Sequence, residues 1–597
     1  MRDKIKWFWK YYKRYPYVLF VLIFLTPVQA ALQVTVPRII EFTIDYAKSG
    51  LVPENRAAVM ITRIGDSLGI SAAAAFALAL MGVGLVSFIL YAYVQSHRGW
   101  MNLKLEWLFR QEAFSGITQK GPDFFNRFRT GDLLTRLTDD VAEKLSWFAC
   151  SGIFRFYEAL LMVTFAVTMM MMIDPVLTLW TAGPLPILII VFFISSSILD
   201  KRYDRLQKSI SGFNDVMEAC FSGIRVIKAY VREQAQKDKF DRAARARREA
   251  EISTVRATIV VDSLYMYIWQ FGIIIAILAG GYMVINSRLT LGKLMAFIYY
   301  VIYLVFPMFD IGQFLVKSRQ SAVSIDRLRE LENVPPMVSD NDGSGRAADI
   351  DGRLCFENVG FAFPGSKRKI IDGVSLDIKS GQTVAVVGKI GSGKSWLVNM
   401  APRLVDPTDG TVSLDGRDLK SYRLEDLRGS IGYIPQEPVL FSDTIENNIR
   451  FGRDNISPET MEWAIEVTQL KNEIDAFPAG VDTRVGTRGM SISGGQKQRL
   501  ALARALVGKP RILILDDCTS ALDSNTENAL WDRLHDVLPD MTAIVITHRP
   551  DTLERADKIV VMEDGKIVET GTHAELMKDG SRYSRIYRRY KLEETVR

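Results

Sequence analysis

The sequence predicts two unlike domains: an all-α transmembrane domain of six helices with long cytosolic helical extensions, followed by an α/β domain. Three observations predict this order. The first half of the chain holds long apolar runs, the second half alternates short apolar strands with helical patterns, and a glycine-rich motif follows one of those strands at residues 388–395. With 597 residues, the chain is also too long for one compact domain.

Six apolar segments account for the predicted membrane domain. A spanning helix needs about 20 predominantly apolar residues. The segments lie at roughly 17–42, 70–95, 147–172, 175–199, 258–284 and 292–317.

The residues before the first span are basic and aromatic. We expect a short interfacial helix there, with Trp7, Trp9 and Tyr11 at the level of the lipid headgroups. A cleaved signal peptide is the alternative. The apolar run from Tyr17 to Ile40 is too long for the apolar core of such a peptide, so a true first span is favoured.

Lysine and arginine residues set the expected orientation, because cytoplasmic loops carry an excess of them. The basic N-terminus is therefore expected in the cytoplasm, together with two long charged loops at 96–146 and 200–257. We expect each loop to be a pair of long helices joined by a cross-piece that contacts the second domain. The cross-pieces are predicted near Thr130–Leu134 and Phe213–Glu218. The net charge of +6 is modest, and the basic residues concentrate near the membrane flanks, so we interpret them as cytoplasmic anchors and not as a nucleic-acid binding surface.

The last predicted span carries an unusual face. A charged side chain at membrane depth is costly, so Asp310 should face protein or water. Two interpretations stay open. The face lines a translocation pathway or inner gate, or it serves helix packing, with Asp310 beyond the bilayer on the cytosolic side. Its members at helical spacing are Tyr299, Tyr303, Phe306, Asp310 and Gln313.

The cysteines argue against a crosslinked or zinc-binding fold. No CxxC pair and no histidine cluster accompanies them. Their pattern fits a soluble part that works in a reducing cytosol. The four are Cys150, Cys220, Cys355 and Cys518.

A linker rich in Pro, Gly, Asn and Asp at 334–350 separates a predicted membrane domain at 1–333 from an α/β domain at 351–597. In the second domain, an apolar strand runs into the P-loop pattern GxxxxGKS and then into a helix. Backbone N–H groups of such a loop wrap phosphates at a helix N-terminus. Lys394 would neutralise the β- and γ-phosphates, and Ser395 would ligate Mg²⁺. The predicted phosphate-binding residues are Gly388, Lys389, Ile390, Gly391, Ser392, Gly393, Lys394 and Ser395.

Other polar residues follow neighbouring apolar strands. Asp516 and Asp517 end the strand 512–515, where Asp516 can hold Mg²⁺ and Asp517 can position water. Gln436 follows a second strand, and His548 follows a third, from which it could contact a γ-phosphate. A serine-glycine motif before a helix suits a γ-phosphate held from the opposite side. It consists of Ser493, Gly494, Gly495 and Gln496.

These motifs together resemble an ATP-binding cassette (ABC) domain. In chain order they are the P-loop, Gln436, the signature Ser493–Gln496, Asp516 with Asp517, Ser520–Asp523 and His548. With six spans before the cassette, the whole chain resembles half-size ABC exporters of the multidrug and lipid type. The resemblance implies that two chains pair head to tail. Each ATP, with its Mg²⁺, then lies between one chain's P-loop and the other's signature.

The resemblance also implies roles for single residues. Phe363 matches the aromatic residue that stacks on adenine, and Asp523 matches the loop that couples the two ATP sites. Gln436 matches the residue that contacts Mg²⁺ and water. The predicted metal contacts are therefore Ser395, Asp516 and Gln436. The predicted catalytic residues are Asp517, His548 and Gln436. Thr487 stands where the family usually has Glu, which would alter transmission through the loop before the signature.

Asp517 is the informative departure, because hydrolytic members of the family carry Glu there. Asp is one methylene shorter, and a misplacement of about 1 Å can cost on the order of 10²-fold in rate. Exporters of this type include heterodimers with one degenerate ATP site. The resemblance therefore implies a heterodimer in which this chain's P-loop holds ATP for long periods. Its intact signature would complete the partner's competent site. The alternative is a working variant in a competent homodimer.

The leading function hypothesis is ATP-driven export of amphipathic drugs, lipids or related solutes by alternating access. The protein would be a multi-pass component of a lipid bilayer, in a bacterial inner or plasma membrane, with its cassette in the cytoplasm. Its expected partner is a second half-transporter chain. A non-transporting, ATP-binding regulator of a channel or enzyme is the second hypothesis.

Overall fold

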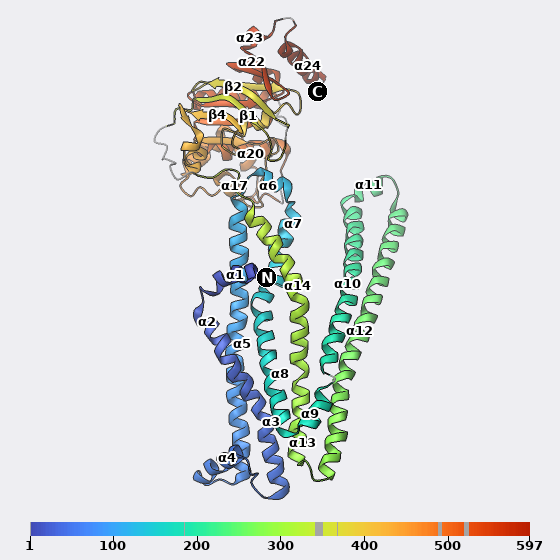
Figure 1. Cartoon of the computed structure of the whole chain (residues 1–597). Coiled ribbons are helices and arrows are strands. Elements are labelled where there is room, and N and C mark those ends of the chain that lie inside the picture. The colour runs from blue at the N-terminus through green and yellow to red at the C-terminus, as the bar shows by residue number, and fades with distance from the viewer. Residues whose placement is uncertain are drawn as a thin grey trace. The chain divides into compact units, whose positions relative to one another are not determined.

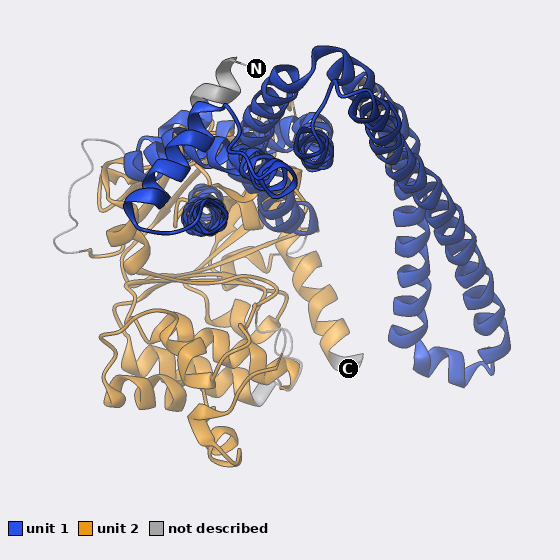
Figure 2. Ribbon diagram, turned by 90° about the horizontal axis from the view of Figure 1, so that it is seen from below, with its two compact units in different colours: residues 1–118, 130–333 blue, residues 119–129, 334–597 orange. Residues whose placement is uncertain are grey.

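The computed structural model describes residues 2–183, 185–340, 350–366, 368–486, 492–518, 524–578 and 580–596. The chain forms two compact units (Figure 2). Unit 1 comprises residues 1–118 and 130–333 and is helical. Unit 2 comprises residues 119–129 and 334–597 and is mainly α/β.

Long helices build unit 1, as Figure 1 shows. Its first part contains α1 (Arg2–Tyr12), α2 (Pro16–Phe20), the π-helical turn Val21–Leu25, α3 (Thr26–Ser49), α4 (Arg56–Ser67) and α5 (Ala72–Thr118). Next come α7 (Thr130–Thr135), the π-helix Arg136–Gly152, α8 (Ile153–Ile173), α9 (Pro175–Ala182) and α10 (Leu185–Ser222). The last are α11 (Ile224–Ala229), α12 (Glu233–Ile285), α13 (Leu291–Tyr303) and α14 (Val305–Asn333).

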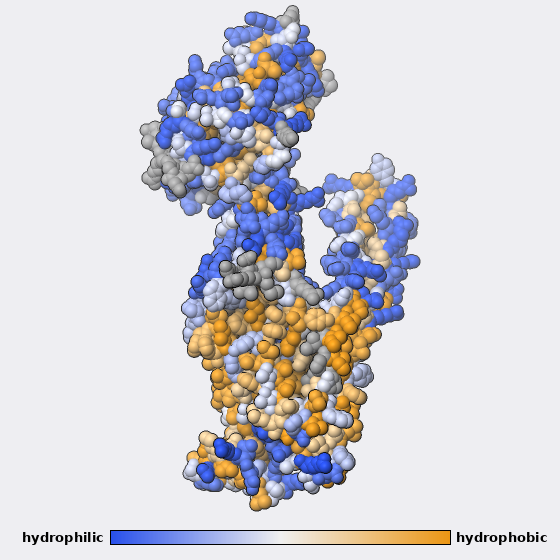
Figure 3. Space-filling view, in the orientation of Figure 1, coloured by the Kyte–Doolittle hydropathy of each residue, from blue (hydrophilic) through white to orange (hydrophobic). Residues whose placement is uncertain are grey.

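Five helical stretches among the described residues are long and apolar enough to cross a membrane. They are Pro16–Ser49, Ala72–Thr118, Thr130–Ile173, Glu233–Ile285 and Leu291–Asn333. The sixth expected span, at 175–199, corresponds to α9 and the first part of α10, and residue 184 between these helices is outside the described residues. Figure 3 shows hydrophobic residues over the middle of the long helices and hydrophilic residues toward their ends. This distribution is the one that a membrane-spanning bundle requires.

The N-terminal helix α1 differs from the expectation of a purely interfacial segment. Tyr11, expected at headgroup level, is 1% exposed and its hydroxyl donates to Glu112 at 2.8 Å. Trp7 stacks on Phe109 of α5 at 5.2 Å between ring centroids. Only Trp9 of the three aromatic residues keeps half of its surface exposed, at 49%. The helix is amphipathic, and the neighbouring protein, not the lipid, covers its aromatic face.

Both cross-pieces lie several residues away from the predicted positions, so these predictions were wrong in detail. In the first loop the short helix is α6 (Pro122–Arg127), whereas Thr130–Leu134 already starts the returning helix. In the second loop the short helix is α11, whereas Phe213–Glu218 lies inside α10. The turns occur at stronger breakers: a Gly121–Pro122 step begins α6, and Gly223 separates α10 from α11. The segment with α6 belongs to unit 2.

Unit 2 is built on two sheets, which confirms the predicted α/β fold class for the second domain. The larger sheet has the order β10-β9-β3-β8-β7-β6, and the smaller has the order β2-β1-β4-β5. The strands are β1 (Leu354–Phe361), β2 (Ile371–Ile378), β3 (Thr383–Gly388), β4 (Asp409–Leu414), β5 (Arg417–Asp418), β6 (Ile431–Ile434), β7 (Ile512–Asp516), β8 (Thr542–Ile546), β9 (Lys558–Glu563) and β10 (Lys566–Gly571).

The helices of unit 2 join and cover these strands. Those before the signature are α15 (Lys394–Val398), α16 (Leu424–Gly429), α17 (Ile445–Arg450), α18 (Pro458–Val467) and α19 (Lys471–Asp475). Those after it are α20 (Gly494–Leu506), α21 (Ser524–Val537), α22 (Pro550–Arg555), α23 (His573–Leu576) and α24 (Arg582–Val596). Short 3₁₀ turns occur at Leu419–Ser421 and Gly480–Asp482.

The central strands of the larger sheet are buried along their length. Every residue of β7 and β8 is buried, as is β3 from Val384 onward. Their sequences are therefore continuous apolar runs without alternation, as expected for parallel strands covered on both faces. The strands β3, β8, β7 and β6 run parallel to their neighbours, so their carboxyl ends share one edge of the sheet.

Candidate nucleotide-binding site

The shared edge collects the motifs that the sequence places after different strands. The P-loop follows β3, and Asp516 ends β7. Gln436 and His548 each follow their strands, β6 and β8, by two residues. The register pairs Asp516 with Ile546 and Leu515 with Ile434, so these polar residues begin at nearly the same level. Ligands of open α/β sheets bind at the carboxyl ends of the strands.

The P-loop backbone is tightly enclosed at two of its glycines, Gly388 and Gly393. Gly388 has φ +151°, and a Cβ atom there would come within 2.2 Å of the carbonyl oxygen of Met562. At Gly393, with φ +97°, a Cβ atom would come within 2.9 Å of the carbonyl oxygen of Ile370. Any side chain at these two positions would displace a neighbouring strand or loop. The glycines thus keep the loop in place before α15, whose N-terminus favours an anion.

Lys394 is nearly buried and points back into the loop. Its Nζ donates to the carbonyl oxygens of Gly388 at 2.8 Å and Lys389 at 2.9 Å. Burial lowers the pKa of Lys394, while the nearby carboxylates of Asp516 and Asp517 raise it. A buried ammonium group within the P-loop suits a negatively charged ligand.

The side-chain hydroxyl group of Ser392 gives independent support for a ligand in the P-loop. Its side-chain oxygen is buried and has no hydrogen-bond partner among the described residues, although the residue is only 4% exposed. Buried hydroxyl groups normally find a partner, and each exception needs an explanation. A phosphate oxygen bound in the P-loop would provide that partner, so the residues present fit a nucleotide.

Asp516 and Ser395 form the pair that would hold Mg²⁺. The carboxyl group of Asp516 is 5% exposed and is hydrogen-bonded by the Ser395 side chain. Burial raises the pKa of Asp516, and the hydrogen bond from Ser395 opposes the rise. No group of three or more His, Cys, Asp or Glu residues is arranged to hold a metal in the parts of the chain that the structure describes. A hydroxyl group and one carboxylate are nevertheless the usual protein ligands of Mg²⁺ that is shared with phosphates.

Asp517 lies one residue beyond the strand in a left-handed backbone conformation, with φ +47°. Its N–H donates to the carbonyl oxygen of Ile546 at 2.9 Å, which fixes the turn. Its Oδ2 is 3.8 Å from Nε2 of His548. Burial raises the pKa of Asp517, and His548, Lys394 and Arg549 oppose the rise. The structure thus brings two of the three predicted catalytic residues, Asp517 and His548, together.

Gln436 and the signature Ser493–Gln496 lie on other elements than the P-loop and the two aspartates. Gln436 is exposed in the loop after β6, beside the strand that ends in Asp516. Ser493 caps α20: its hydroxyl accepts from the N–H of Gln496 at 3.2 Å, and Oε1 of Gln496 accepts from the N–H of Ser493 at 2.8 Å. This capping box fixes the helix N-terminus on which the signature Ser493–Gln496 sits.

Phe363, expected to stack on adenine, belongs to an aromatic cluster in front of the P-loop. Its ring meets Trp396 edge to face at 4.9 Å and Phe361 at 5.5 Å. Phe363 itself is only half-buried, so part of its ring is accessible to a planar base. Asp523, the rest of the segment Ser520–Asp523, and Thr487 lie outside the described residues.

Sequence reasoning missed two partners of the site. Tyr590, on the C-terminal helix α24, lies with its hydroxyl 2.7 Å from Nδ1 of His548. Trp396 follows the P-loop serine and stacks on Phe361 at 5.4 Å. No motif marks Tyr590. An aromatic residue directly after the P-loop could have suggested the role of Trp396.

Polar contacts also join the helices of the membrane domain. Arg98 donates to Glu158 at 2.7 Å, and Gln29 donates to the other oxygen of that carboxylate at 2.9 Å. Arg155 lies 3.7 Å from Asp310, so Asp310 faces a basic protein group, as the cost of a charge near lipid demands. Tyr299 remains 45% exposed. A role of this face in translocation stays a prediction.

Comparison with known proteins decides the family. The sequence model described as "ABC transporter transmembrane region" matches residues 19–308, and the one described as "ABC transporter" matches residues 371–520. The probable multidrug resistance ABC transporter ATP-binding/permease protein YheI of Bacillus subtilis is 30% identical over 99% of this chain and 97% of its own length. The chain belongs to the ABC transporter family.

Two further proteins are similar to this ABC transporter over most of its length. The ATP-dependent lipid A-core flippase of Thiobacillus denitrificans is 33% identical over 82% of this chain and 84% of its own. The solved structure of a bacterial Atm1-family ABC exporter with ATP bound has the same fold. Its TM-score is 0.77 at 23% identity, over 96% of this chain and 98% of that chain. One transmembrane domain followed by one nucleotide-binding domain is the architecture of an ABC exporter half-transporter.

Proposed function

We propose that this ABC transporter exports amphipathic drugs, lipids or related solutes, and that its own ATP site hydrolyses slowly. Relatives named as a multidrug transporter and a lipid A-core flippase support the substrate class. Asp517 carries the second half of the proposal. It occupies the position of the carboxylate that positions the attacking water, and its side chain is one methylene shorter than that of Glu.

The surroundings of Asp517 do not compensate for its length. The N–H bond to Ile546 anchors its backbone, and the described side chain leans toward His548 at 3.8 Å. Moving the backbone forward to make up for the missing methylene would therefore break this hydrogen bond. A shift of about 1 Å in a catalytic group costs on the order of 10²-fold in rate. By contrast, the residues that would bind the phosphates are complete, from Gly388 to Ser395.

The signature is intact, so this chain can still serve a second ATP site. The capping box of Ser493 and Gln496 preserves the N-terminus of α20, which offers N–H groups and a hydroxyl to a phosphate. We therefore propose a heterodimer. The partner half-transporter would contribute the competent carboxylate, and this chain would contribute Ser493–Gln496 to that partner's ATP.

In this proposal the binding residues have separate duties. Lys394 would neutralise the β- and γ-phosphates, while Ser395, Asp516 and Gln436 would hold Mg²⁺. The bound ion would balance the phosphate charge. His548 would orient toward the terminal phosphate, and the ring of Phe363 would pack against the base. The proposed domains remain 1–333 and 351–597 with a linker at 334–350. The excess of basic residues supports a cytoplasmic position of the cassette.

The test is the steady-state ATPase activity of the purified chain alone in lipid. We expect slow turnover that Asp517→Ala reduces little further, because the carboxylate contributes little to begin with. Brisk turnover that Asp517→Ala abolishes would favour a competent homodimer instead. ATP-dependent accumulation of a dye in inverted vesicles that contain both partners would distinguish export from a regulatory role, in which no dye accumulates.

A further inference from the structure

The C-terminal helix reaches the nucleotide site through one side chain. The Tyr590 hydroxyl lies 2.7 Å from Nδ1 of His548, and the two rings meet edge to face at 5.0 Å and 88°. On the far side of the same imidazole, Nε2 lies 3.8 Å from Oδ2 of Asp517. Tyr590, His548 and Asp517 therefore form a row in which Tyr590 is hydrogen-bonded to the imidazole on one side and the carboxylate of Asp517 faces it on the other.

We propose that Tyr590 is a positioning residue for His548. Its hydroxyl donates to Nδ1, so that Nε2 carries the ring proton and acts as the donor toward Asp517 and the nucleotide. The proposal concerns the ABC nucleotide site of this chain and does not depend on whether the transporter is a heterodimer.

The surrounding charges decide which tautomer is favoured. If His548 carried its proton on Nδ1, the Nε2 lone pair would face the lone pairs of the Asp517 carboxylate, which is repulsive. With the proton on Nε2, the same contact is attractive, and Nδ1 needs a donor. Tyr590 can supply that donor at neutral pH, because burial raises the pKa of its hydroxyl to about 12.

The helix that carries Tyr590 is firmly anchored. Tyr590 is 9% exposed and packs in a core with Leu553, Val561, Tyr583 and Tyr587. At the start of α24, the carboxylate of Glu569 accepts from the N–H groups of Arg582 and Tyr583 at 2.8 and 2.9 Å. A donor on a fixed support restrains the imidazole better than water would, because fewer orientations remain.

The chain contains a matched control for this contact. His573 and Tyr583 form the same kind of pair, with the hydroxyl 2.7 Å from Nδ1 and the rings edge to face at 89°. Tyr583 lies on α24, as Tyr590 does, but its histidine belongs to α23 and not to the residues after β8. Tyr583→Phe therefore removes an equal hydrogen bond from the same helix without touching His548.

The experiment is ¹⁵N NMR of the full-length chain in lipid with labelled histidine. The chain has four histidines, and His548→Asn identifies the signal of His548. We expect a single tautomer of His548 with the proton on Nε2. Tyr590→Phe, which keeps the ring, should give a mixture of tautomers, and Tyr583→Phe should leave the His548 signal unchanged.

Equilibrium binding of ATP to the same samples tests the consequence for the ligand. Loss of one oriented hydrogen bond is expected to weaken ATP binding about fivefold in Tyr590→Phe, and not in Tyr583→Phe. A proton on Nδ1 in the unaltered chain, or the same tautomer in Tyr590→Phe, would overturn the proposal. So would equal ATP affinities of the unaltered chain and Tyr590→Phe.

Discussion

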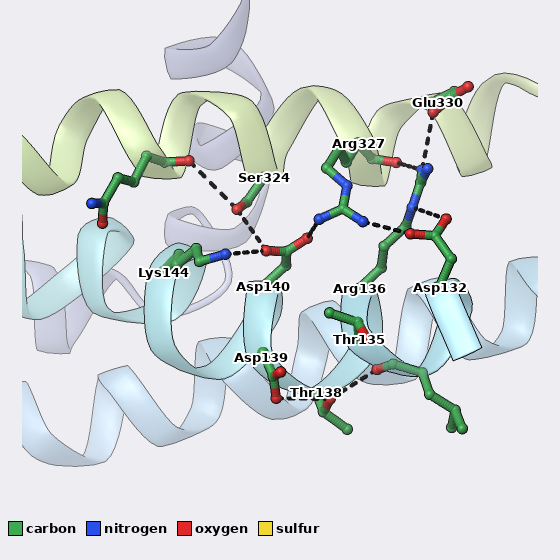
Figure 4. A network of polar contacts seen from close by, with 12 residues as sticks. Asp132, Thr135, Arg136, Thr138, Asp139, Asp140, Lys144, Ser324, Arg327 and Glu330 are labelled. Carbon is green, nitrogen blue, oxygen red and sulfur yellow. Dashed lines mark hydrogen bonds and ion pairs between the residues drawn. The ribbon is translucent and has the colours of Figure 1, made fainter. Parts of the chain in front are cut away.

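Two polar clusters of this protein use charged residues in opposite ways. In unit 1, a network joins the π-helix Arg136–Gly152 to α14 (Figure 4). Arg327 contacts Asp140 at 2.5 Å and Asp132 at 2.6 Å, and Asp140 also accepts from Lys144 at 2.7 Å. In unit 2, the edge of the sheet keeps Asp517 3.8 Å from His548 and leaves the Ser392 hydroxyl without a partner among the described residues.

The difference separates structure from function. Asp132, Asp140 and Glu330 each pair with an arginine of the network, so these ion pairs hold two helices together. The nucleotide edge instead contains buried groups whose interactions are incomplete in the free chain. Groups of this kind mark functional sites because a ligand completes them. Four substitutions test this distinction, in order of decreasing effect.

The largest effect is expected for Lys394→Ala. Its ammonium group is the cation most deeply enclosed by the P-loop, and charge-assisted hydrogen bonds to phosphate are strong, so ATP affinity should fall about 10²-fold. Equilibrium ATP binding to the full chain measures this. Lys389→Ala is the control, because only the backbone of Lys389 belongs to the P-loop while its side chain is 81% exposed and pairs with Glu563, so it should change affinity by less than about threefold. Equal losses in both variants would contradict the assignment.

Arg327→Ala should chiefly destabilise unit 1. It leaves the buried carboxylate of Asp140, which is 3% exposed, without its closest cation. Breaking a buried ion pair costs several kcal/mol, but the Arg327 side chain is 33% exposed, so we expect about 2 kcal/mol. Thermal unfolding measures the loss, and ATP affinity should stay unchanged. Arg423→Ala removes an exposed pair with Glu425 and should cost at most about 0.5 kcal/mol. A loss no larger than this control would refute the structural role of the network.

Asp516→Asn should change how stability depends on pH. The folded-state pKa of Asp516 is raised by burial, so folding penalises its ionised form. The penalty is fully present above the raised pKa. It disappears as the pH falls below the pKa that this carboxyl group has in the unfolded chain. Asp516→Asn should therefore stabilise the nucleotide-free chain at pH 7, and this advantage should shrink as the pH falls through the raised pKa of Asp516. An advantage that grows toward low pH would show that the sign is wrong.

Ser392→Ala should have the smallest effect and the most specific one. The Ser392 hydroxyl has no partner among the described residues, so its removal should leave the unfolding temperature unchanged or slightly raised. ATP affinity should nevertheless fall about threefold, since the phosphate loses a donor. Ser395→Ala provides the comparison, because it also removes the hydrogen bond to Asp516. A drop in stability without a change in ATP affinity would mean that Ser392 is structural.

The nucleotide site was largely predictable because its residues follow local rules. A P-loop needs a strand, glycines and a helix in sequence, and Asp516 and His548 follow strands whose carboxyl ends share one edge. The predicted cross-pieces were misplaced because Thr130–Leu134 and Phe213–Glu218 lie within helices, whereas the chain turns at Gly121–Pro122 and Gly223. Tyr590 could not be found, since it meets His548 only through the packing of a terminal helix 42 residues away.

The central claim is that the shortened carboxylate of Asp517 slows hydrolysis at this chain's own ATP site. Single-turnover hydrolysis of ATP bound to the chain tests this claim most directly. The full-length chain in lipid is mixed with less than one equivalent of labelled ATP, and phosphate release is followed for the unaltered chain and Asp517→Glu. We expect Asp517→Glu to accelerate release about 10²-fold with little change in ATP affinity, because it restores only the missing methylene. An unaltered chain that already releases phosphate as fast as, or faster than, Asp517→Glu would contradict the account.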